Sequence, residues 1–259
     1  MELVLTERKE SVVLLTINRP EGLNALNREL IKTLSELLAE LAGDDSIRAL
    51  IITGAGDRAF VAGADIGEMA GMDRPEAEIL ARFGSRLMRQ ISQFPVPVIA
   101  AINGFALGGG FELALACDLR LASDGARFAF PETGLGITPG FGGTQRLARL
   151  AGAMPAFDLI MTGRRIKAEE ARDLGLVMEV TAATDLLPRA WELAETIAGK
   201  APAAVREAKR AIRMGLDLPL DEGLTLEEGG FGRCFETGDQ KRAMSAFMNK
   251  EEIPPFEGK

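Results

Sequence analysis

The sequence has no histidine and no tyrosine, and its 259 residues include only two cysteines, Cys117 and Cys234. The lack of histidine excludes Ser-His-Asp and Cys-His catalytic sites and removes the usual nitrogen ligands of zinc and haem. Two cysteines that lie far apart in the chain exclude a disulfide framework and a four-cysteine metal site. We therefore expect no metal site, and acid–base chemistry near neutral pH has to come from Asp, Glu, Lys or Cys.

A basic excess is lacking as well, because 30 Lys and Arg residues stand against 38 Asp and Glu residues, for a net charge of −8. This balance argues against a dedicated nucleic-acid-binding protein, since such proteins bind by neutralising phosphates. A small anionic ligand stays open, because a few local cations or helix N-termini are enough to hold one.

Long uninterrupted apolar runs are also missing. The longest apolar stretch, residues 96–117, contains Pro97, Asn103, Glu112 and four glycines, so it cannot form a continuous membrane-spanning helix. The apolar stretch at the N-terminus is too short for a signal peptide, and acidic residues interrupt it. We therefore expect a cytoplasmic protein without a membrane span.

The apolar pattern predicts strands that alternate with helices, followed by helices alone. Runs rich in β-branched residues predict strands at residues 12–17, 48–53, 60–62, 98–102, 119–122 and 128–130. Helical spacing predicts early helices after Asn27, from Pro75 and from Phe111. Beyond about residue 140 only 177–180 resembles a strand, and helical spacing covers residues 143–151, 155–162, 168–174, 185–199, 202–214 and 219 onward. This order predicts an α/β core with a helical C-terminal region.

Three consecutive glycines, Gly108–Gly110, lie where a predicted strand meets a predicted helix, and Glu112 follows in the first turn of that helix. Glycines at such a turn let the backbone approach a ligand closely and leave N–H groups unpaired. A tight turn without a ligand is the alternative. A phosphate loop has poor support, because the Lys-Ser/Thr pair and the GxGxxG spacing are both absent.

Glu132 lies between an aromatic segment, residues 128–130, and a loop rich in glycine and proline that runs to Gly140. Apolar surroundings destabilise a charged carboxylate and raise its pKa, which suits a general acid. A solvated loop glutamate is the plainer interpretation. The small residues of a third segment, residues 60–66, can present a further backbone N–H, although by themselves they indicate only a turn.

One predicted helix carries a basic face made of Arg206, Lys209, Arg210 and Arg213. Such a face can contact RNA or the anionic tail of a cofactor. Basic helix faces are more often simply solvated, so both interpretations stay open.

Several segments occur in one order over nearly the whole chain and are typical of a single superfamily. They are residues 18–20 with 23–26, 62–66, 97–103, 106–112 with 117–118, 131–132 through 142–146, and 243–247. With this combination the chain resembles the enoyl-CoA hydratase/isomerase (crotonase) superfamily. The resemblance implies an α/β fold: a spiral of ββα units over residues 1–195, then a helical trimerisation region over residues 196–259. It also implies a homo-oligomer, either a trimer or a dimer of trimers.

The resemblance further implies the site. The backbone N–H groups of Ala64 and Gly109 match the pair that binds the thioester oxygen, where charge develops during the reaction. Glu112 matches the residue that holds and activates water, and Glu132 matches the proton donor. The substrate is then an acyl-CoA thioester, and no separate cofactor is implied because coenzyme A is part of the substrate. Matching substrate-binding positions are Ala62, Asp65, Ile66, Leu107, Gly108, Pro131, Gly140, Phe247 and Lys250, the last two often supplied by a neighbouring subunit.

Two departures affect the expected contacts to the coenzyme A phosphates. Gly67 stands where many hydratases have lysine, and Glu251 and Glu252 follow Lys250 where relatives are often basic. Binding is then expected to depend more on other arginines.

The expected activity is hydration of a trans-2-enoyl-CoA to a 3-hydroxyacyl-CoA, with short chains such as crotonyl-CoA, in fatty-acid metabolism such as β-oxidation. The alternatives are double-bond isomerisation, hydration of a branched enoyl-CoA, or a side role in RNA binding. A pair of glutamates favours hydration over isomerisation, since the isomerases usually keep only the counterpart of Glu132.

Overall fold

Two β-sheets organise the chain in the computed structural model, which describes residues 2–259. The strands are β1 (Val4–Lys9), β2 (Val12–Ile17), β3 (Ala49–Gly54), β4 (Ala59–Val61), β5 (Val98–Ile102), β6 (Phe105–Leu107), β7 (Leu119–Ser123), β8 (Arg127–Ala129), β9 (Ile166–Lys167) and β10 (Glu179–Thr181). The α-helices are α1 (Arg28–Leu41), α2 (Ile66–Met69), α3 (Arg74–Ser92), α4 (Gly109–Ala116), α5 (Gly143–Ala151), α6 (Ala153–Thr162), α7 (Ala168–Asp173), α8 (Leu186–Ala198), α9 (Pro202–Gly215), α10 (Leu220–Cys234) and α11 (Gly238–Asn249). Two 3-10 turns, η1 (Pro20–Gly22) and η2 (Glu132–Leu135), complete the elements.

From β3 to β8, consecutive strands of the chain alternate between the two sheets. The larger sheet has the order β1-β2-β3-β5-β7-β10, and the smaller one has the order β4-β6-β8-β9. Thus β3 and β4, β5 and β6, and β7 and β8 are successive pairs that each place one strand in each sheet before the chain turns into helix. Neighbouring strands are parallel except in the β1–β2 and β8–β9 pairs. This is a spiral of ββα units, so the predicted α/β fold is confirmed.

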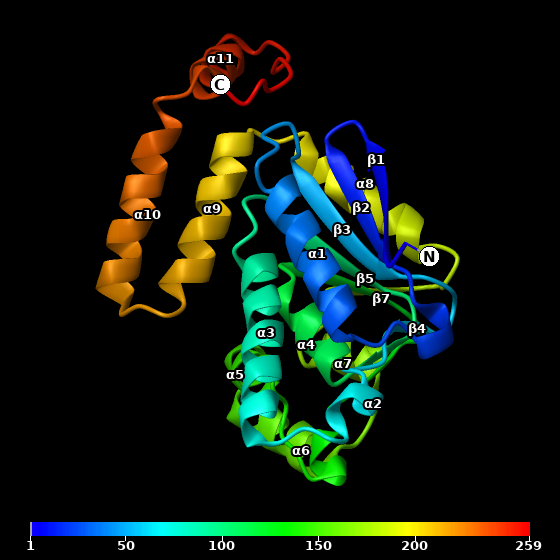
Figure 1. Ribbon diagram of the computed structural model, residues 1–259. Helices are drawn as coiled ribbons and strands as arrows, with labels where there is room; N and C mark the ends of the chain where they lie inside the picture. Colours follow the sequence, from blue (N-terminus) through cyan, green and yellow to red (C-terminus); the bar gives the residue numbers. More distant parts are fainter. Residues whose placement is uncertain (1) are drawn as a thin grey trace.

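Helices cover both faces of the larger sheet, which explains the apolar character of its central strands. Every residue of β3 and of β5 is buried, as is typical of parallel strands that are covered on both sides. One face packs against a row of α8 residues four apart, Ala190, Ala194 and Ala198. The other face packs against the apolar sides of α1 and α3. Figure 1 shows α8 behind the sheet and α1 in front of it.

The basic face of α9 contacts the core, which corrects the interpretation of that face as solvated or free to bind an anion. Lys209 Nζ lies 2.6 Å from Asp118 Oδ2, and Arg213 Nε lies 2.9 Å from Asp118 Oδ1. Arg206 Nη1 lies 3.0 Å from Asp45 Oδ1. Arg210 Nη1 lies 3.8 Å from Glu207 Oε2. All four cations are therefore paired within the chain, and the face does not offer RNA a free basic stripe.

The apolar pattern misses four short elements, β1, α2, β6 and β9. The pattern does not indicate β1 because five of its six residues are exposed at the sheet edge, and it does not indicate β9 because that strand has only two residues. The strand expected at 177–180 is β10, which begins two residues later, and the helical run from residue 219 is divided into α10 and α11.

The predicted boundary between residues 195 and 196 falls in the last turn of α8. Beyond α8, helices α9 and α10 form an antiparallel pair beside the body, and α11 lies at the upper end of the molecule (Figure 1). The division into two regions at this boundary stays a prediction. Within residues 2–259, none of the helices has the length and apolar character that a membrane crossing requires.

Close packing of α4 on β4 depends on Gly110, because a Cβ there would lie 1.9 Å from the carbonyl oxygen of Val61. We expect Gly110→Ala to destabilise the fold by roughly 1–3 kcal/mol or more, since the core has to shift to admit the methyl group. Gly232→Ala is the matched control on α10, where a Cβ meets nothing within 4 Å; it should be neutral or stabilising. Urea unfolding followed by circular dichroism at one protein concentration measures both. Equal midpoints for the two variants would contradict the packing argument.

Candidate active site

The N-terminus of α4 carries the first of the two predicted catalytic carboxyl groups. Glu112 lies in the first turn of this helix and is only 1% exposed. Its Oε1 accepts the backbone N–H groups of Phe141, at 2.8 Å, and Gly143, at 2.7 Å. The loop before α5 therefore fixes the orientation of the carboxyl group and leaves Oε2 as its available oxygen.

The second carboxyl group lies directly beside this helix end. Glu132 begins η2 and is 9% exposed, and its Oε2 is buried without a hydrogen-bond partner among residues 2–259. A Cβ on Gly108 would lie 2.5 Å from Glu132 Oε1, and the backbone of Gly108 has a φ of +46°. Gly108 is thus required both for the turn into α4 and for the space that Glu132 occupies. The expectation of a solvated loop glutamate is excluded.

Burial changes the acidity of both groups. It raises the pKa of Glu132 from its ordinary value of 4.5 to about 7, and the nearby charge of Glu112 adds to the increase. Burial also raises the pKa of Glu112, while the N–H groups of Gly143 and Phe141 and the charge of Arg146 oppose that increase. Two N–H groups that donate to one carboxyl oxygen stabilise the ionised form of that carboxyl group. The arrangement therefore favours a state near neutral pH in which the two carboxyl groups hold a single proton, and this proton is on Glu132.

Two residues whose backbone N–H groups have no backbone acceptor in the described part of the chain, Ala64 and Gly109, lie beside each other. A Cβ on Gly109 would lie 3.3 Å from the nitrogen of Ala64, so the two predicted oxyanion-hole residues are adjacent. No backbone acceptor pairs with either N–H within residues 2–259. Gly109 is also the first residue of α4, where free N–H groups and the helix dipole favour negative charge.

Most of the predicted substrate-binding residues flank these groups. Ala62 and Asp65 lie on the same loop as Ala64, and Ile66 follows as the first residue of α2. Asp65 forms an ion pair with Arg19 at 2.8 Å. Asp65 also caps α2 through the N–H of Gly67, so its carboxylate is already used within the fold. Leu107 and Gly108 immediately precede Gly109, and Pro131 immediately precedes Glu132.

Gly140, Phe247 and Lys250 are the remaining predicted residues. Gly140 is exposed and its carbonyl accepts the hydroxyl of Ser85 at 3.1 Å. Phe247 is exposed in the last turn of α11 and Lys250 is exposed at its C-cap; α11 lies at the upper end of the molecule, whereas α4 lies within the body (Figure 1). The chain does not bring these two residues to its own site.

The sequence pattern did not indicate roles for Gly143 and Arg146, although they belong to a segment that matches the superfamily, and it did not show what the neighbouring Phe141 contacts. Phe141 is buried, and a Cβ on Gly84 would lie 2.3 Å from its ring. A Cβ on Gly109 would lie 3.3 Å from the same ring. The ring therefore fills the space between α3 and the start of α4. The sequence shows only one aromatic residue and two distant glycines, and their contact can be recognised only in the folded structure.

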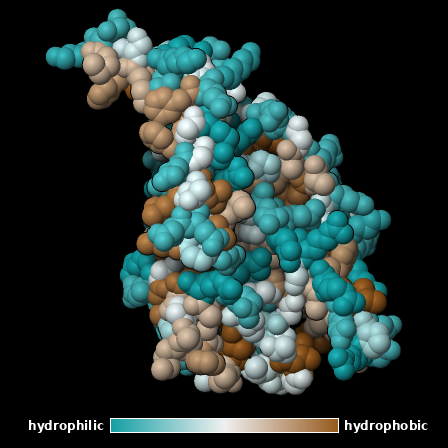
Figure 2. Space-filling view, turned by 90° about the vertical axis from the view of Figure 1, so that its left-hand side faces the viewer, coloured by the Kyte–Doolittle hydropathy of each residue, from teal (hydrophilic) through white to brown (hydrophobic). Residues whose placement is uncertain are grey.

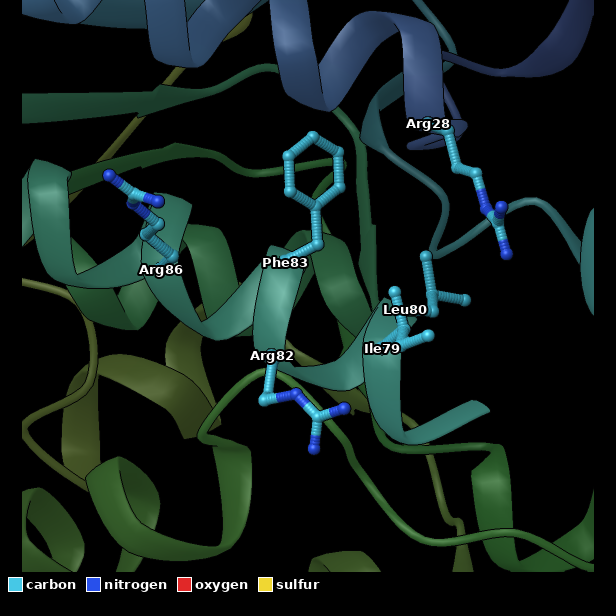
Figure 3. A pocket seen from close by; sticks show the side chains of 6 residues that line it. All are labelled: Arg28, Ile79, Leu80, Arg82, Phe83 and Arg86. Atoms are coloured by element: carbon cyan, nitrogen blue, oxygen red, sulfur yellow. The ribbon is translucent and has the colours of Figure 1, made fainter. Parts of the chain in front are cut away.

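A hollow of about 280 Å³ lies elsewhere, between α3 and the start of α1, and is lined by Arg28, Ile79, Leu80, Arg82, Phe83 and Arg86. In Figure 3 the three arginines point away from one another, so their guanidinium groups do not converge on one anion. The hollow contains neither glutamate of the pair and neither of the two free N–H groups. Burial, unpaired donors and shifted acidity all favour the N-terminus of α4 as the chemical site. Residues 2–259 contain no group of three or more Cys, Asp or Glu side chains that could hold a metal ion.

Known proteins resemble this chain over nearly its whole length. Residues 7–259 match the model of the family described as enoyl-CoA hydratase/isomerase. The chain is 48% identical to a short-chain-enoyl-CoA hydratase of Clostridium acetobutylicum, over 99% of this chain and 98% of the relative. It is 45% identical to a crotonyl-CoA hydratase of Syntrophomonas wolfei, over 96% of each.

Among solved structures, the fold is similar to that of an enoyl-CoA hydratase from Bacillus anthracis, with a TM-score of 0.96, 41% identity and complete coverage of both chains. The family match and these relatives extend over essentially the whole chain. The chain therefore belongs to the enoyl-CoA hydratase/isomerase family.

Proposed function

We propose that this protein is an enoyl-CoA hydratase, a lyase that reversibly adds water to a short-chain trans-2-enoyl-CoA and gives the 3-hydroxyacyl-CoA. One observation carries the proposal: two buried carboxyl groups, Glu112 and Glu132, lie at the helix end that also presents the free N–H groups of Ala64 and Gly109. The names of the relatives from Clostridium acetobutylicum and Syntrophomonas wolfei support the same reaction. Coenzyme A enters as part of the substrate, and the reaction needs no further cofactor.

The proposed chemistry follows from the placement of these groups. The thioester oxygen accepts hydrogen bonds from Ala64 and Gly109, and the free oxygen of Glu112 holds a water molecule. Glu112 takes a proton from this water while the water oxygen bonds to Cβ, and the electrons of the double bond move toward the thioester oxygen. Glu132 then gives its proton to Cα, which restores the thioester. The two N–H groups stabilise the charge at its maximum, an effect typically worth roughly 2.7–4 kcal/mol for each donor.

Hydration explains the site better than double-bond isomerisation does. An isomerase moves one proton between two carbon atoms, for which a single carboxyl group is sufficient. Here Glu112 is held by two donors and is free to act on water at its other oxygen. The second carboxyl group is thus accounted for by hydration and superfluous for isomerisation.

A homo-oligomer, either a trimer or a dimer of trimers, is part of the proposal. Large apolar side chains are exposed on the last three helices and on the turn between α9 and α10, among them Ile212, Leu216, Leu220, Phe231, Phe247 and Met248. Figure 2 faces the α10 side of the molecule and shows apolar side chains interspersed among polar ones. The number of large exposed apolar side chains on three consecutive helices, rather than any single one of them, supports a surface that packs against another subunit. In such an assembly, Phe247 and Lys250 would meet the adenosine end of coenzyme A bound to a neighbouring subunit. A cytoplasmic location and a role in β-oxidation stay predictions.

The glutamate pair is tested by hydration of crotonyl-CoA, followed by loss of the enoyl-thioester absorbance. We expect Glu112→Gln and Glu132→Gln each to lower kcat by roughly 10²–10⁴-fold with little change in KM, because each removes proton transfer but keeps the shape of the side chain. Glu195→Gln, on the exposed side of α8, is the control. Full activity in either variant of the pair would contradict the mechanism. Identification of a 3-enoyl-CoA as the main product would favour isomerisation.

The pH dependence of hydration tests the acidity of Glu132, whose pKa is raised to about 7. Because Glu132 has to carry the proton, kcat/KM should fall as the pH rises through about 7, and Glu132→Gln should retain a residual rate without this decrease. Crotonyl-pantetheine should be measured beside crotonyl-CoA, because the 3′-phosphate of coenzyme A ionises in a similar range. A wild-type rate that stays constant from pH 6 to pH 9 would contradict the assignment.

The ring of Phe141 is proposed to limit the length of the acyl chain, since it closes the space between the thioester site and α3. Phe141→Ala should raise the ratio of kcat/KM for 2-octenoyl-CoA to that for crotonyl-CoA by at least about tenfold, because four added methylenes gain roughly 0.8 kcal/mol each when buried. Phe83→Ala is the control, since this ring lines the separate hollow of about 280 Å³ beside α3 (Figure 3). An unchanged ratio in Phe141→Ala would exclude this role.

A further inference from the structure

Arg146, in α5, holds the loop that orients Glu112. Its Nη1 donates a hydrogen bond of 3.1 Å to the carbonyl oxygen of Phe141. The N–H of the same residue, Phe141, donates to Glu112 Oε1, as does the N–H of Gly143. The guanidinium is therefore one peptide unit away from the donors that fix the proposed catalytic carboxylate.

The loop is shaped around this guanidinium. Gly142, between the two donors, has a φ of +111°, and a Cβ there would lie 2.1 Å from Arg146 Nη1. The carbonyl of Gly142 in turn accepts the backbone N–H of Arg146 at 2.9 Å. The loop and the first turn of α5 thus form one closed unit, in which a side chain on Gly142 would displace the guanidinium.

The charges that face Arg146 make Glu112 its main favourable partner. Arg213 on α9 and Arg89 on α3 are like charges, and burial together with these neighbours lowers the pKa of Arg146. Cys117, at the end of α4, is neutral because burial raises its pKa to about 12. No ion pair within 4 Å joins Arg146 to a carboxylate among residues 2–259. Glu112 itself is faced by the cation of Arg146 and by the carboxyl group of Glu132.

We propose that Arg146 is a positioning residue for hydration: it holds the Phe141–Gly143 loop against Glu112, and its charge keeps that buried carboxylate ionised. The inference rests on the proposed function, because it assigns Glu112 the role of the group that activates water. It goes beyond that function by placing part of the control of Glu112 in α5. A purely structural arginine would stabilise the loop without changing the proton affinity of Glu112.

The test compares Arg146→Gln and Arg146→Lys with Arg149→Gln, a variant of an exposed arginine on the same helix. For Arg146→Gln we expect kcat for crotonyl-CoA to fall by roughly tenfold to a hundredfold, because the loop and the carboxylate move. The acid limb of kcat/KM should move to higher pH by about one unit, since loss of a nearby cation raises the pKa of Glu112. Arg146→Lys should keep the acid limb in place and recover part of kcat, and Arg149→Gln should match the wild type.

Two further measurements keep the outcome clear. In a Glu112→Gln background, Arg146→Gln should have little additional effect on the residual rate, because the arginine acts through that carboxylate. The protonation of Glu112 is also followed without turnover, by infrared titration of its carboxyl band with Glu112→Gln as the reference. If Arg146→Gln folds poorly, the titration can be made on Arg146→Met, which keeps an apolar stem in the same place and removes the charge. A midpoint above that of the wild type is expected there, and an unchanged midpoint would contradict the inference.

An acid limb and a carboxyl titration that do not move in Arg146→Gln would overturn the inference, as would additive losses in the double variant. Failure of the wild type to hydrate crotonyl-CoA would instead contradict the proposed function. The infrared titration would then still decide whether Arg146 controls the proton affinity of Glu112.

Discussion

The close approach of α4 to β4 is the constraint on which the site depends. Gly110 lets the helix backbone pack on Val61, and this contact fixes where the helix begins. Gly109 then lies beside Ala64, and neither N–H has a backbone acceptor among residues 2–259. In the same first turn the helix carries Glu112 into the core, and Gly108 leaves the space that Glu132 fills. Small side chains at one strand–helix junction thus place both the donors and the acids of the proposed reaction.

Burying two carboxyl groups together is unfavourable unless their charge is controlled. The hydrogen-bond partners of the two carboxyl groups differ. Glu112 receives two N–H donors from a loop that Arg146 holds, whereas Glu132 has a buried oxygen without a partner and a raised pKa. This difference separates a carboxylate that accepts a proton from an acid that donates one. It also explains why hydration, which needs both at once, suits the site better than isomerisation.

The sequence was sufficient for those parts of the fold and site that local pattern encodes. Apolar runs predicted strands such as β3 and β5. The glycines at the start of α4, together with Glu112 and Glu132, formed recognisable motifs. Contacts between distant segments were not predictable. The basic face of α9 resembled a solvated surface because its partners, Asp45 and Asp118, lie far away in the chain. Likewise, the ring of Phe141 has meaning only beside Gly84 and Gly109, and the role of Arg146 only through the loop that it holds.

The position of a bound substrate analogue tests this account most directly. Butanoyl-CoA has no double bond and cannot take up water, so a crystal structure of the protein with this thioester would show the complex before reaction. We predict that the thioester oxygen lies about 2.7–3.2 Å from the nitrogens of both Ala64 and Gly109, with Cα and Cβ between Glu112 and Glu132. A thioester that contacts neither nitrogen, for example one bound in the hollow beside α3, would contradict the account.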